Sequence, residues 1–158
     1  MGAGALHIIR NRRHELQGLC CVEVKVYPLF SAFAGSANAF ALSVEITPCN
    51  SDPCVLVTGE PVTVDIMFTA TEDIRGGSAS MQVVNGNVIR WLPPPNKTLC
   101  ECLNPSCPIE EGGTHVYRHT LEIIDNIPSH EPEIRLELLN EQKSVFFCIQ
   151  FPVQINAF

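Results

Sequence analysis

The sequence is poor in charge and has no long apolar run. Charged residues make up 17% of its 158 residues and hydrophobic residues 46%, a balance typical of a folded chain. No stretch of about 18 consecutive apolar residues occurs, which excludes a transmembrane helix. A helical hydrophobic period is missing, and twelve prolines spread along the chain also disfavour a helical bundle. The length suits one domain.

Basic residues are few. The chain has 10 Lys and Arg against 17 Asp and Glu. Residues 1–30 hold four basic and two acidic residues, a net of +2, and residues 31–158 hold six and fifteen, a net of −9. An acidic domain lacks the positive surface that binds phosphate backbones, so nucleic acid is excluded as a partner.

Motifs of catalysis and cofactor binding are also missing. There is no G-x-S-x-G turn, no phosphate-binding loop and no G-x-G-x-x-G, and nothing singles out a pair of carboxylates. His115 and His119 could form a metal pair on one strand face. No third ligand lies near them, so two solvated histidines are the preferred interpretation. The sequence indicates no catalytic residue, no cofactor and no metal, and a small disulfide-bonded hydrolase is the least favoured class.

Eight cysteines, in contrast, are many for this length. Two groups in turn-rich sequence could each close a short loop: Cys49 with Cys54, and Cys100 or Cys102 with Cys107. Zinc held by the second group with His115 or His119 is a weaker alternative, because no second knuckle of ligands is present. The cysteines therefore predict disulfides and an oxidising location, which is either extracellular or an endolysosomal lumen.

The first 33 residues make a poor secretion signal. Three arginines between residues 10 and 13 could form its basic start, but Glu23 and Lys25 interrupt the apolar stretch that should follow. The segment is either a degenerate leader or a start that is not native. We expect residues 1–33 to lie outside the domain, which then spans residues 34–158.

Short apolar runs with turns between them predict an all-β fold. Residues 62–68 alternate most regularly, with Val64 and Ile66 on the inner face. Further runs occur at residues 43–47, 81–89, 114–124, 133–139 and 145–155. Turn-forming residues predict an exposed turn at 71–80, a bulge or tight bend at 85–87 and a hairpin turn at 140–143. About seven strands at roughly 8–14-residue spacing indicate a β-sandwich.

One triplet predicts a modification. Asn96-Lys97-Thr98 is an N-glycosylation sequon, and it follows three prolines that favour an exposed loop. We expect Asn96 to carry a glycan if the protein passes through the secretory pathway.

Four motifs in order along residues 35–155 resemble the ML lipid-recognition family. They are Gly35-Ser36 followed by S-V-E-I-T-P-C at 43–49, D-P-C-V-L-V-T-G at 52–59, C-P-I at 107–109, and F-F-C-I-Q-F-P-V-Q-I at 146–155. Within the family, the resemblance is nearest to the branch of Niemann–Pick type C lysosomal cholesterol carriers and their arthropod relatives, which include mite allergens.

The resemblance implies an immunoglobulin-like β-sandwich of two antiparallel sheets with an apolar cavity between them. The expected function is non-covalent binding and transfer of a sterol, fatty acid or related lipid by a monomer, with a membrane or a lipid-transfer protein as partner. An extracellular module that presents lipid to a protein receptor is the alternative. The expected lipid contacts are the inward apolar residues Ile46, Leu56, Val64, Ile66, Phe68, Leu92, Tyr117, Leu121, Leu136, Leu138, Ile149, Phe151 and Val153.

Two positions depart from the family pattern. In the family, a cysteine before the Gly-Ser pair bonds to the cysteine of the last strand, which is Cys148 here, but Ala34 occupies that first position. Cys148 is therefore expected to be free or to pair with Cys20 or Cys21. Glu131 replaces a tyrosine that precedes a proline at the pocket mouth of the carriers, which moves the expectation from cholesterol to lipids more generally.

Overall fold

The computed structural model describes residues 4–13, 22–27, 30–35, 39–49, 51, 53–85, 88–92, 98–123 and 132–156. Within these ranges nearly every residue lies in a strand or turn, and the helical element is the 3₁₀ turn η1 (Cys100–Cys102). None of the described residues forms a helix long and apolar enough to cross a membrane. The strands are β1 (Gly4–Arg13), β2 (Val22–Tyr27), β3 (Phe30–Gly35), β4 (Ala39–Thr47), β5 (Cys54–Val57), β6 (Pro61–Ala70), β7 (Gly77–Asn85), β8 (Val88–Trp91), β9 (Leu103–Asn104), β10 (Thr114–Glu122), β11 (Glu133–Asn140) and β12 (Val145–Asn156).

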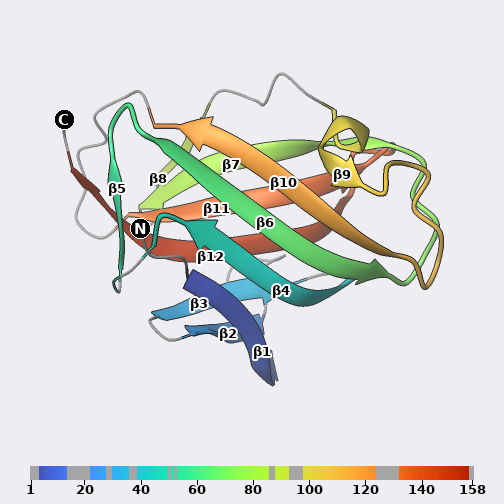
Figure 1. Cartoon of the computed structure of the whole chain (residues 1–158), viewed down its shortest axis with the longest axis horizontal. Coiled ribbons are helices and arrows are strands. Elements are labelled where there is room, and N and C mark those ends of the chain that lie inside the picture. Colours follow the sequence, from blue (N-terminus) through green and yellow to red (C-terminus); the bar gives the residue numbers. More distant parts are fainter. Residues whose placement is uncertain are drawn as a thin grey trace.

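Two sheets face each other in Figure 1. The front sheet has the strand order β4-β6-β10-β9, and the back sheet has the order β8-β7-β11-β12 with β5 parallel to β12. All other neighbours in these sheets pair antiparallel. The predicted sandwich of antiparallel sheets is confirmed, whereas the cavity between the sheets stays a prediction.

The strands β1, β2 and β3 join the two sheets along one side. β1 pairs with β4 of the front sheet, β3 pairs with β12 of the back sheet, and β2 lies between them. Most of this segment falls within residues 1–33, which the sequence analysis places outside the domain. That residues 1–33 are a poor leader or a non-native start remains a prediction.

β6 shows how sequence alternation becomes a buried face. Val64, Ile66 and Phe68 have no exposed surface, whereas Met67 on the other face is 39% exposed. Asp65, also on the outer face, accepts a hydrogen bond from Nε of Arg118 on β10 at 2.5 Å. The pattern predicted the inner face correctly because one side of an antiparallel sheet packs on the core and the other meets water.

The exposed turn predicted at residues 71–80 is wrong over its second half. β7 begins at Gly77, which pairs with Asn140 of β11. A Cβ atom on Gly77 would lie 1.8 Å from the carbonyl oxygen of Leu139, so glycine here permits a close approach of two strands and does not mark a turn. Ile74 is also completely buried and exchanges two backbone hydrogen bonds of 2.8 Å with Ile109.

The apolar run at residues 81–89 divides between two strands. β7 and β8 pair antiparallel, with Asn85 opposite Val88. The tight bend expected at residues 85–87 concerns Gly86 and Asn87, which lie outside the described residues. β8 is an edge strand of its sheet. Its position agrees with the three prolines that follow it, because proline cannot donate a hydrogen bond to a neighbouring strand.

A bulge in β12 turns two adjacent phenylalanines into the core. Leu138 of β11 pairs with Phe147, but Leu139 pairs with Val145, so Phe146 is the extra residue of the bulge. Phe146 and Phe147 are both buried. Strict alternation would place one of them outside, and the extra residue of the bulge removes this constraint.

The hairpin turn predicted at residues 140–143 is confirmed. Asn140 Oδ1 accepts hydrogen bonds from the backbone N–H groups of Gln142 and Ser144, each at 3.0 Å. Lys143 has a positive φ of 61°, which fits the tight reversal between β11 and β12.

The outer face of the back sheet holds buried polar side chains, which simple alternation does not predict. Arg135 and Glu137 of β11 are only 7% and 8% exposed. Oε1 of Glu137 accepts a hydrogen bond from Nε2 of Gln82 on β7 at 2.5 Å. Alternation therefore separates the residues of β11 into two faces but does not make the polar face exposed.

Candidate functional site

The space between the sheets brings together the thirteen residues that the sequence predicts as lipid contacts. Leu92 and Leu121 are partly buried and pack against the core. The other eleven have at most 1% of their surface exposed: Ile46, Leu56, Val64, Ile66, Phe68, Tyr117, Leu136, Leu138, Ile149, Phe151 and Val153. All thirteen belong to one apolar cluster or its border. Contact of any of them with a lipid remains a prediction.

The same cluster contains buried residues that the sequence analysis did not select. They include Val44, Val62, Met81, Val83, Leu103, Ile134, Phe146 and Phe147 on strands, and Ile74, Leu99 and Ile109 in loops. Val44, Met81 and Val83 lie in alternating runs, so the same period-two pattern that predicts the burial of Ile46 and Val64 also predicts theirs. The loop residues lie outside any alternating run, and their burial is decided by the way their loops fold over the end of the sandwich.

Phe68 occupies the centre of an aromatic group that spans both sheets. Its ring centroid lies 6.0 Å from that of Phe146 and 6.3 Å from that of Phe147, both on β12. His115 on the neighbouring strand β10 stacks on Phe68 at 6.2 Å with ring planes 25° apart. These rings tie the front sheet to the back sheet through apolar contact.

The prediction of two solvated histidines is wrong for His115. Its side chain is 5% exposed, and its Nδ1 donates a hydrogen bond of 2.6 Å to the carbonyl oxygen of Pro105. His119, four residues further along β10, is half-buried, and its ring centroid lies 6.3 Å from that of Tyr117. Their face of β10 is therefore an inner face, with His115 deeper than His119.

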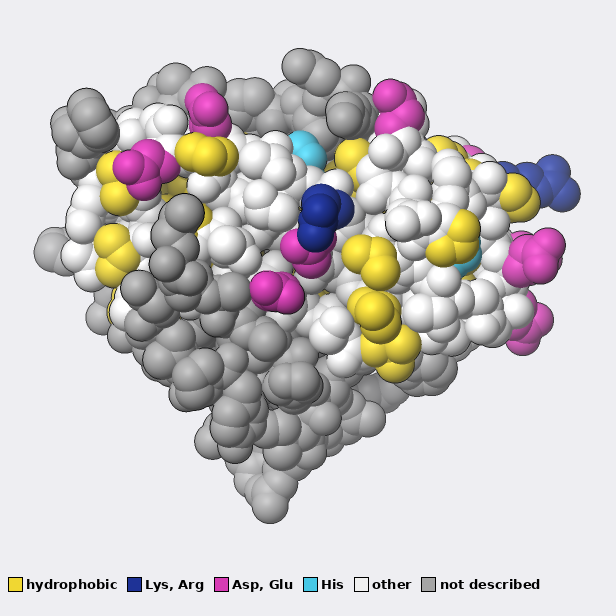
Figure 2. Space-filling view, viewed as in Figure 1, with side chains coloured by type: hydrophobic (Ala, Val, Ile, Leu, Met, Phe, Trp, Pro, Cys, Tyr) yellow, Lys and Arg dark blue, Asp and Glu magenta, His cyan; other side chains and the backbone are white. Residues whose placement is uncertain are grey.

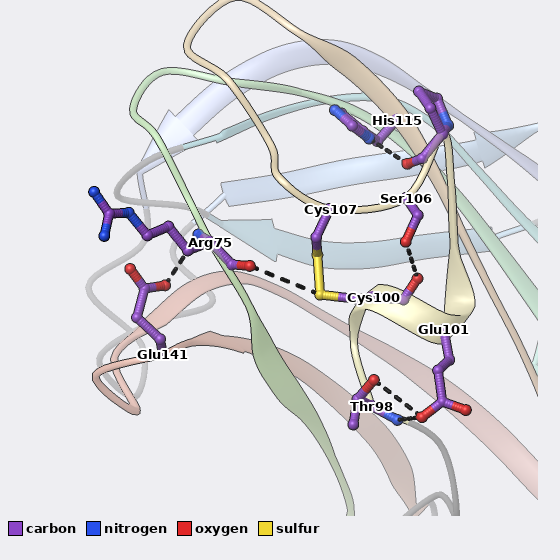
Figure 3. The surroundings of a disulfide bond; sticks show 9 residues. Arg75, Thr98, Cys100, Glu101, Ser106, Cys107, His115 and Glu141 are labelled. Atoms are coloured by element: carbon purple, nitrogen blue, oxygen red, sulfur yellow. Dashed lines mark hydrogen bonds between the residues drawn. A yellow bond between two sulfur atoms is a disulfide. The ribbon is translucent and has the colours of Figure 1, made fainter.

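A disulfide loop covers the end of the interior next to His115 (Figure 3). Cys100 is bonded to Cys107, which resolves the alternative left open by the sequence. The Oγ atom of Ser106 donates a hydrogen bond of 2.7 Å to the carbonyl oxygen of Cys100. At the start of this loop, the N–H and hydroxyl groups of Thr98 both donate to Oε1 of Glu101 at 3.1 Å.

A second contact fastens this end to the back sheet. The backbone N–H of Arg75 donates a hydrogen bond of 3.2 Å to a carboxylate oxygen of Glu141, which lies in the turn between β11 and β12. The pKa of Glu141 is lowered from its usual value, first by the hydrogen bond from its own backbone N–H and then by those from the backbone of Arg75 and Gly76. The disulfide loop, the segment before β7 and the β11–β12 turn thus meet at one end of the sandwich.

The opposite end carries the other local disulfide. Cys49, after β4, is bonded to Cys54 at the start of β5, as the sequence predicts. Both sulfur-bearing side chains are buried. The bond holds the crossing from the front sheet to the back sheet, because β5 pairs with the last residues of β12.

Cys102 is the cysteine of this group that is not in a disulfide. The prediction that it could bond to Cys107 is therefore wrong. It is partly buried against the core and precedes Leu103, which pairs with Tyr117. Tyr117 is completely buried, and its hydroxyl has no hydrogen bond of normal geometry. Burial, followed by the influence of the Cys102 thiol, raises the pKa of Tyr117 above its usual value.

Three further predictions reach beyond the described residues. Cys148 is in a disulfide, so it is not free, and the prediction that Cys20 or Cys21 is its partner concerns residues outside the described ranges. The strand register places Gly35 opposite Cys148. The sequon residue Asn96 and the pocket-mouth position Glu131 also lie outside the described part of the chain.

The outer surface of the front sheet is mixed in character (Figure 2). Arg118, whose side chain is 71% exposed, forms an ion pair with Asp65. Leu42 and Met67 are exposed apolar residues on this sheet, and Ile89 and Trp91 are exposed on β8. In the part of the chain that the structure describes, no three His, Cys, Asp or Glu side chains gather closely enough to hold a metal ion.

Known proteins share this sequence pattern and this fold. The profile of the ML domain family matches residues 35–155. NPC intracellular cholesterol transporter 2 of Bos taurus is 27% identical over 123 residues, which cover 78% of this chain and 82% of the bovine protein. The ecdysteroid-regulated 16 kDa protein of Manduca sexta is 31% identical over 133 residues, which cover 80% and 88% of the two chains.

A solved structure supports the same fold. The crystal structure of a Niemann-Pick type C2 protein from Japanese carpenter ant has a TM-score of 0.68 and 22% sequence identity with this chain, covering 77% of it and 96% of the ant protein. The residues matched by the family profile cover the strands of both sheets of the sandwich, except for Asn156, the last residue of β12. The resemblance seen in the four sequence motifs is thereby confirmed, and the chain belongs to the ML domain family.

Proposed function

We propose that this protein is a lipid carrier that binds a sterol or related lipid non-covalently between its two sheets. The observation that carries the proposal is that the family match at residues 35–155 covers a sandwich whose facing surfaces are apolar almost throughout. Related proteins include cholesterol transporters. Burial of an apolar ligand contributes roughly 25 cal/mol of binding free energy per Å². Because this burial is reversible, uptake and release of the lipid require no chemical step.

The proposed carrier works in an oxidising compartment, either outside the cell or in the endolysosomal lumen. The two local disulfides and the bonded Cys148 support this location, because such bonds persist where thiols are not kept reduced. Passage through the secretory pathway would also give Asn96 access to glycosylation. A mass shift removed by an N-glycosidase, and absent from Asn96→Gln, would establish that modification.

Binding and transfer can be tested with a defined probe. The oxidised full chain should bind the fluorescent sterol dehydroergosterol saturably and with one site, and should carry it between phosphatidylcholine vesicles faster than spontaneous exchange. A matched control is heat-denatured protein with its disulfides reduced. Absence of saturable binding to dehydroergosterol, cholesterol and oleyl alcohol alike would overturn the proposal.

Exposed apolar residues favour one alternative, a module that presents lipid to a protein receptor. Ile89 and Trp91 lie on the same face of the edge strand β8 and are 49% and 67% exposed, so a partner could cover them. If the protein presents lipid, Ile89→Ser with Trp91→Ser should leave lipid binding intact and abolish co-purification of a receptor from the native source. If it carries lipid, the same variant should still accept and release sterol.

A further inference from the structure

The outer face of the front sheet carries apolar side chains in one row across its strands. Met67 of β6 pairs with Ser43 of β4 on one side and with Val116 of β10 on the other. Met67 is 39% exposed, and Leu42, the extra residue where the register shifts between Ala41 and Ser43, is 48% exposed. Figure 2 shows hydrophobic side chains gathered on this face. Apolar surface therefore meets water on a sheet face that is ordinarily polar.

The next row of the same face is charged. Asp65 of β6 pairs with Glu45 of β4 and with Arg118 of β10. The Nε atom of Arg118 donates a hydrogen bond of 2.5 Å to Asp65, and the Arg118 side chain is 71% exposed. Glu45 is exposed as well. The face therefore presents an acidic group on β4 and a basic group on β10, with the apolar row beside them.

This arrangement is complementary to itself under a twofold rotation. When two copies pack front sheet to front sheet about an axis parallel to β6, β4 of one copy lies over β10 of the other. Glu45 of each copy then lies opposite Arg118 of the other copy, and the two Met67 side chains meet at the axis. Sheets that pack face to face are about 10 Å apart, a spacing that these long side chains can bridge from both sides.

We propose that this face binds a second copy of the chain and forms a symmetric dimer through β4, β6 and β10. Charge complementarity selects a second copy, because the same three strands supply both the acidic and the basic partner. Three strands make a small contact, so the expected dimer is weak, with a Kd on the order of 10 μM.

The dimer goes beyond the proposed lipid binding and replaces the monomer that the sequence analysis expects. The proposed lipid site uses the inner faces of β4, β6 and β10, where Ile46 and Ile66 are buried. The dimer uses the outer faces of the same strands. Each copy therefore keeps its lipid site when the two copies associate.

Sedimentation velocity of the oxidised full chain, from about 2 to 200 μM, measures the association around the expected Kd. The average mass should rise with concentration from that of one chain toward that of two. Met67→Asp should weaken association about tenfold or more, because it places two carboxylates opposite each other at the axis. The double change Ile89→Ser with Trp91→Ser removes the exposed apolar residues of β8. It is the matched control and should leave the Kd unchanged.

Charge reversal tests how the two copies are oriented. Glu45→Arg and Arg118→Glu should each weaken association about tenfold or more, because each places like charges opposite each other twice. An equimolar mixture of these two variants should associate like the wild-type chain, since every such contact in the mixed dimer again joins an acid to a base. A chain with both changes should also dimerise. Lys143→Glu, in the exposed turn between β11 and β12, is the control and should leave the Kd unchanged.

The outcomes separate the dimer from the proposed lipid carrier. Every folded variant should bind dehydroergosterol like the wild-type chain, because the changed side chains lie outside the interior. A wild-type chain that stays monomeric up to about 200 μM, or a mixture of the two charge-reversal variants that stays monomeric, would overturn the dimer and leave the carrier in place. Association lost in the β8 variant and kept in Met67→Asp would also overturn it, because the contact would then lie on β8. A dimer that binds no lipid would overturn only the carrier.

Discussion

Phe68 of the front sheet and Phe147 of the back sheet stack across the interior, with ring centroids 6.3 Å apart and ring planes at 24°. Phe68 also contacts Phe146 and His115, so one side chain joins three others from both sheets. This relationship identifies Phe68 as the residue whose removal should loosen the sandwich most directly.

Phe68→Ala should reduce the free energy of unfolding by about 3–5 kcal/mol, because it removes a completely buried ring and leaves a cavity. Urea denaturation followed by circular dichroism measures this loss. Met67→Ala, on the exposed face of the same strand, is the control and should cost about 0.5 kcal/mol or less. Equal losses in the two variants would contradict the central role of Phe68.

Val64→Asp should abolish folding or lipid binding, because it places an unpaired carboxylate at a position with no exposed surface. Thr63→Asp, one residue earlier and on the outer face, should fold and bind like the parent chain. The yield of oxidised protein and the binding of dehydroergosterol report the two effects. A folded Val64→Asp chain with unchanged affinity would show that β6 does not line the lipid site.

The disulfide of the Cys100–Cys107 loop should stabilise the protein, whereas the Cys102 thiol should not be needed for folding. Chain entropy gives a crosslink of this short separation about 2.5 kcal/mol, which the double change to serine at positions 100 and 107 should remove. Cys102→Ser should cost about 1 kcal/mol or less. Peptide mapping without reduction should recover the Cys100–Cys107 link, and a Cys102–Cys107 link would refute the assignment.

Stability should fall at alkaline pH because of Tyr117. Its folded-state pKa is raised above the usual value of about 10, so above that pH the unfolded chain loses the phenolic proton while the folded chain keeps it. The unfolded state then binds fewer protons, and the free energy of unfolding decreases by up to about 1.4 kcal/mol per pH unit. This contribution is complete below about pH 10.

Tyr117→Phe tests the alkaline effect. Urea denaturation at pH 8, 10 and 11 should show a smaller decrease in this variant than in the parent chain, since phenylalanine cannot ionise. A parallel decrease in both chains would mean that other groups cause the alkaline loss.

Residue patterns along the chain were enough to predict the sandwich and most of its inner face. Val64, Ile66 and Phe68 alternate with polar residues on β6, and this period requires one buried and one exposed face wherever a sheet packs on a core. Cys49 and Cys54 lie close enough in sequence for their loop to be closed by a bond. These features are local, so a single sequence contains them.

Features that depend on contacts between distant segments could not be predicted. Gly77 resembles a turn residue, but the approach of β11 makes it the start of a strand. His115 resembles a solvated polar residue, but the loop that carries Pro105 covers it. The outcome at each position depends on a segment that the local pattern does not contain.

By itself, the sequence determined a disulfide-bonded, all-β domain of the ML family, because alternation, turn residues and cysteine spacing act over a few residues. The tertiary structure alone decided that Cys100 and not Cys102 bonds to Cys107, and that Tyr117 and His115 of β10 are buried. Disulfide pairing and burial depend on distances between side chains in space. Those distances are fixed only when the two sheets pack together and the end loops close over them.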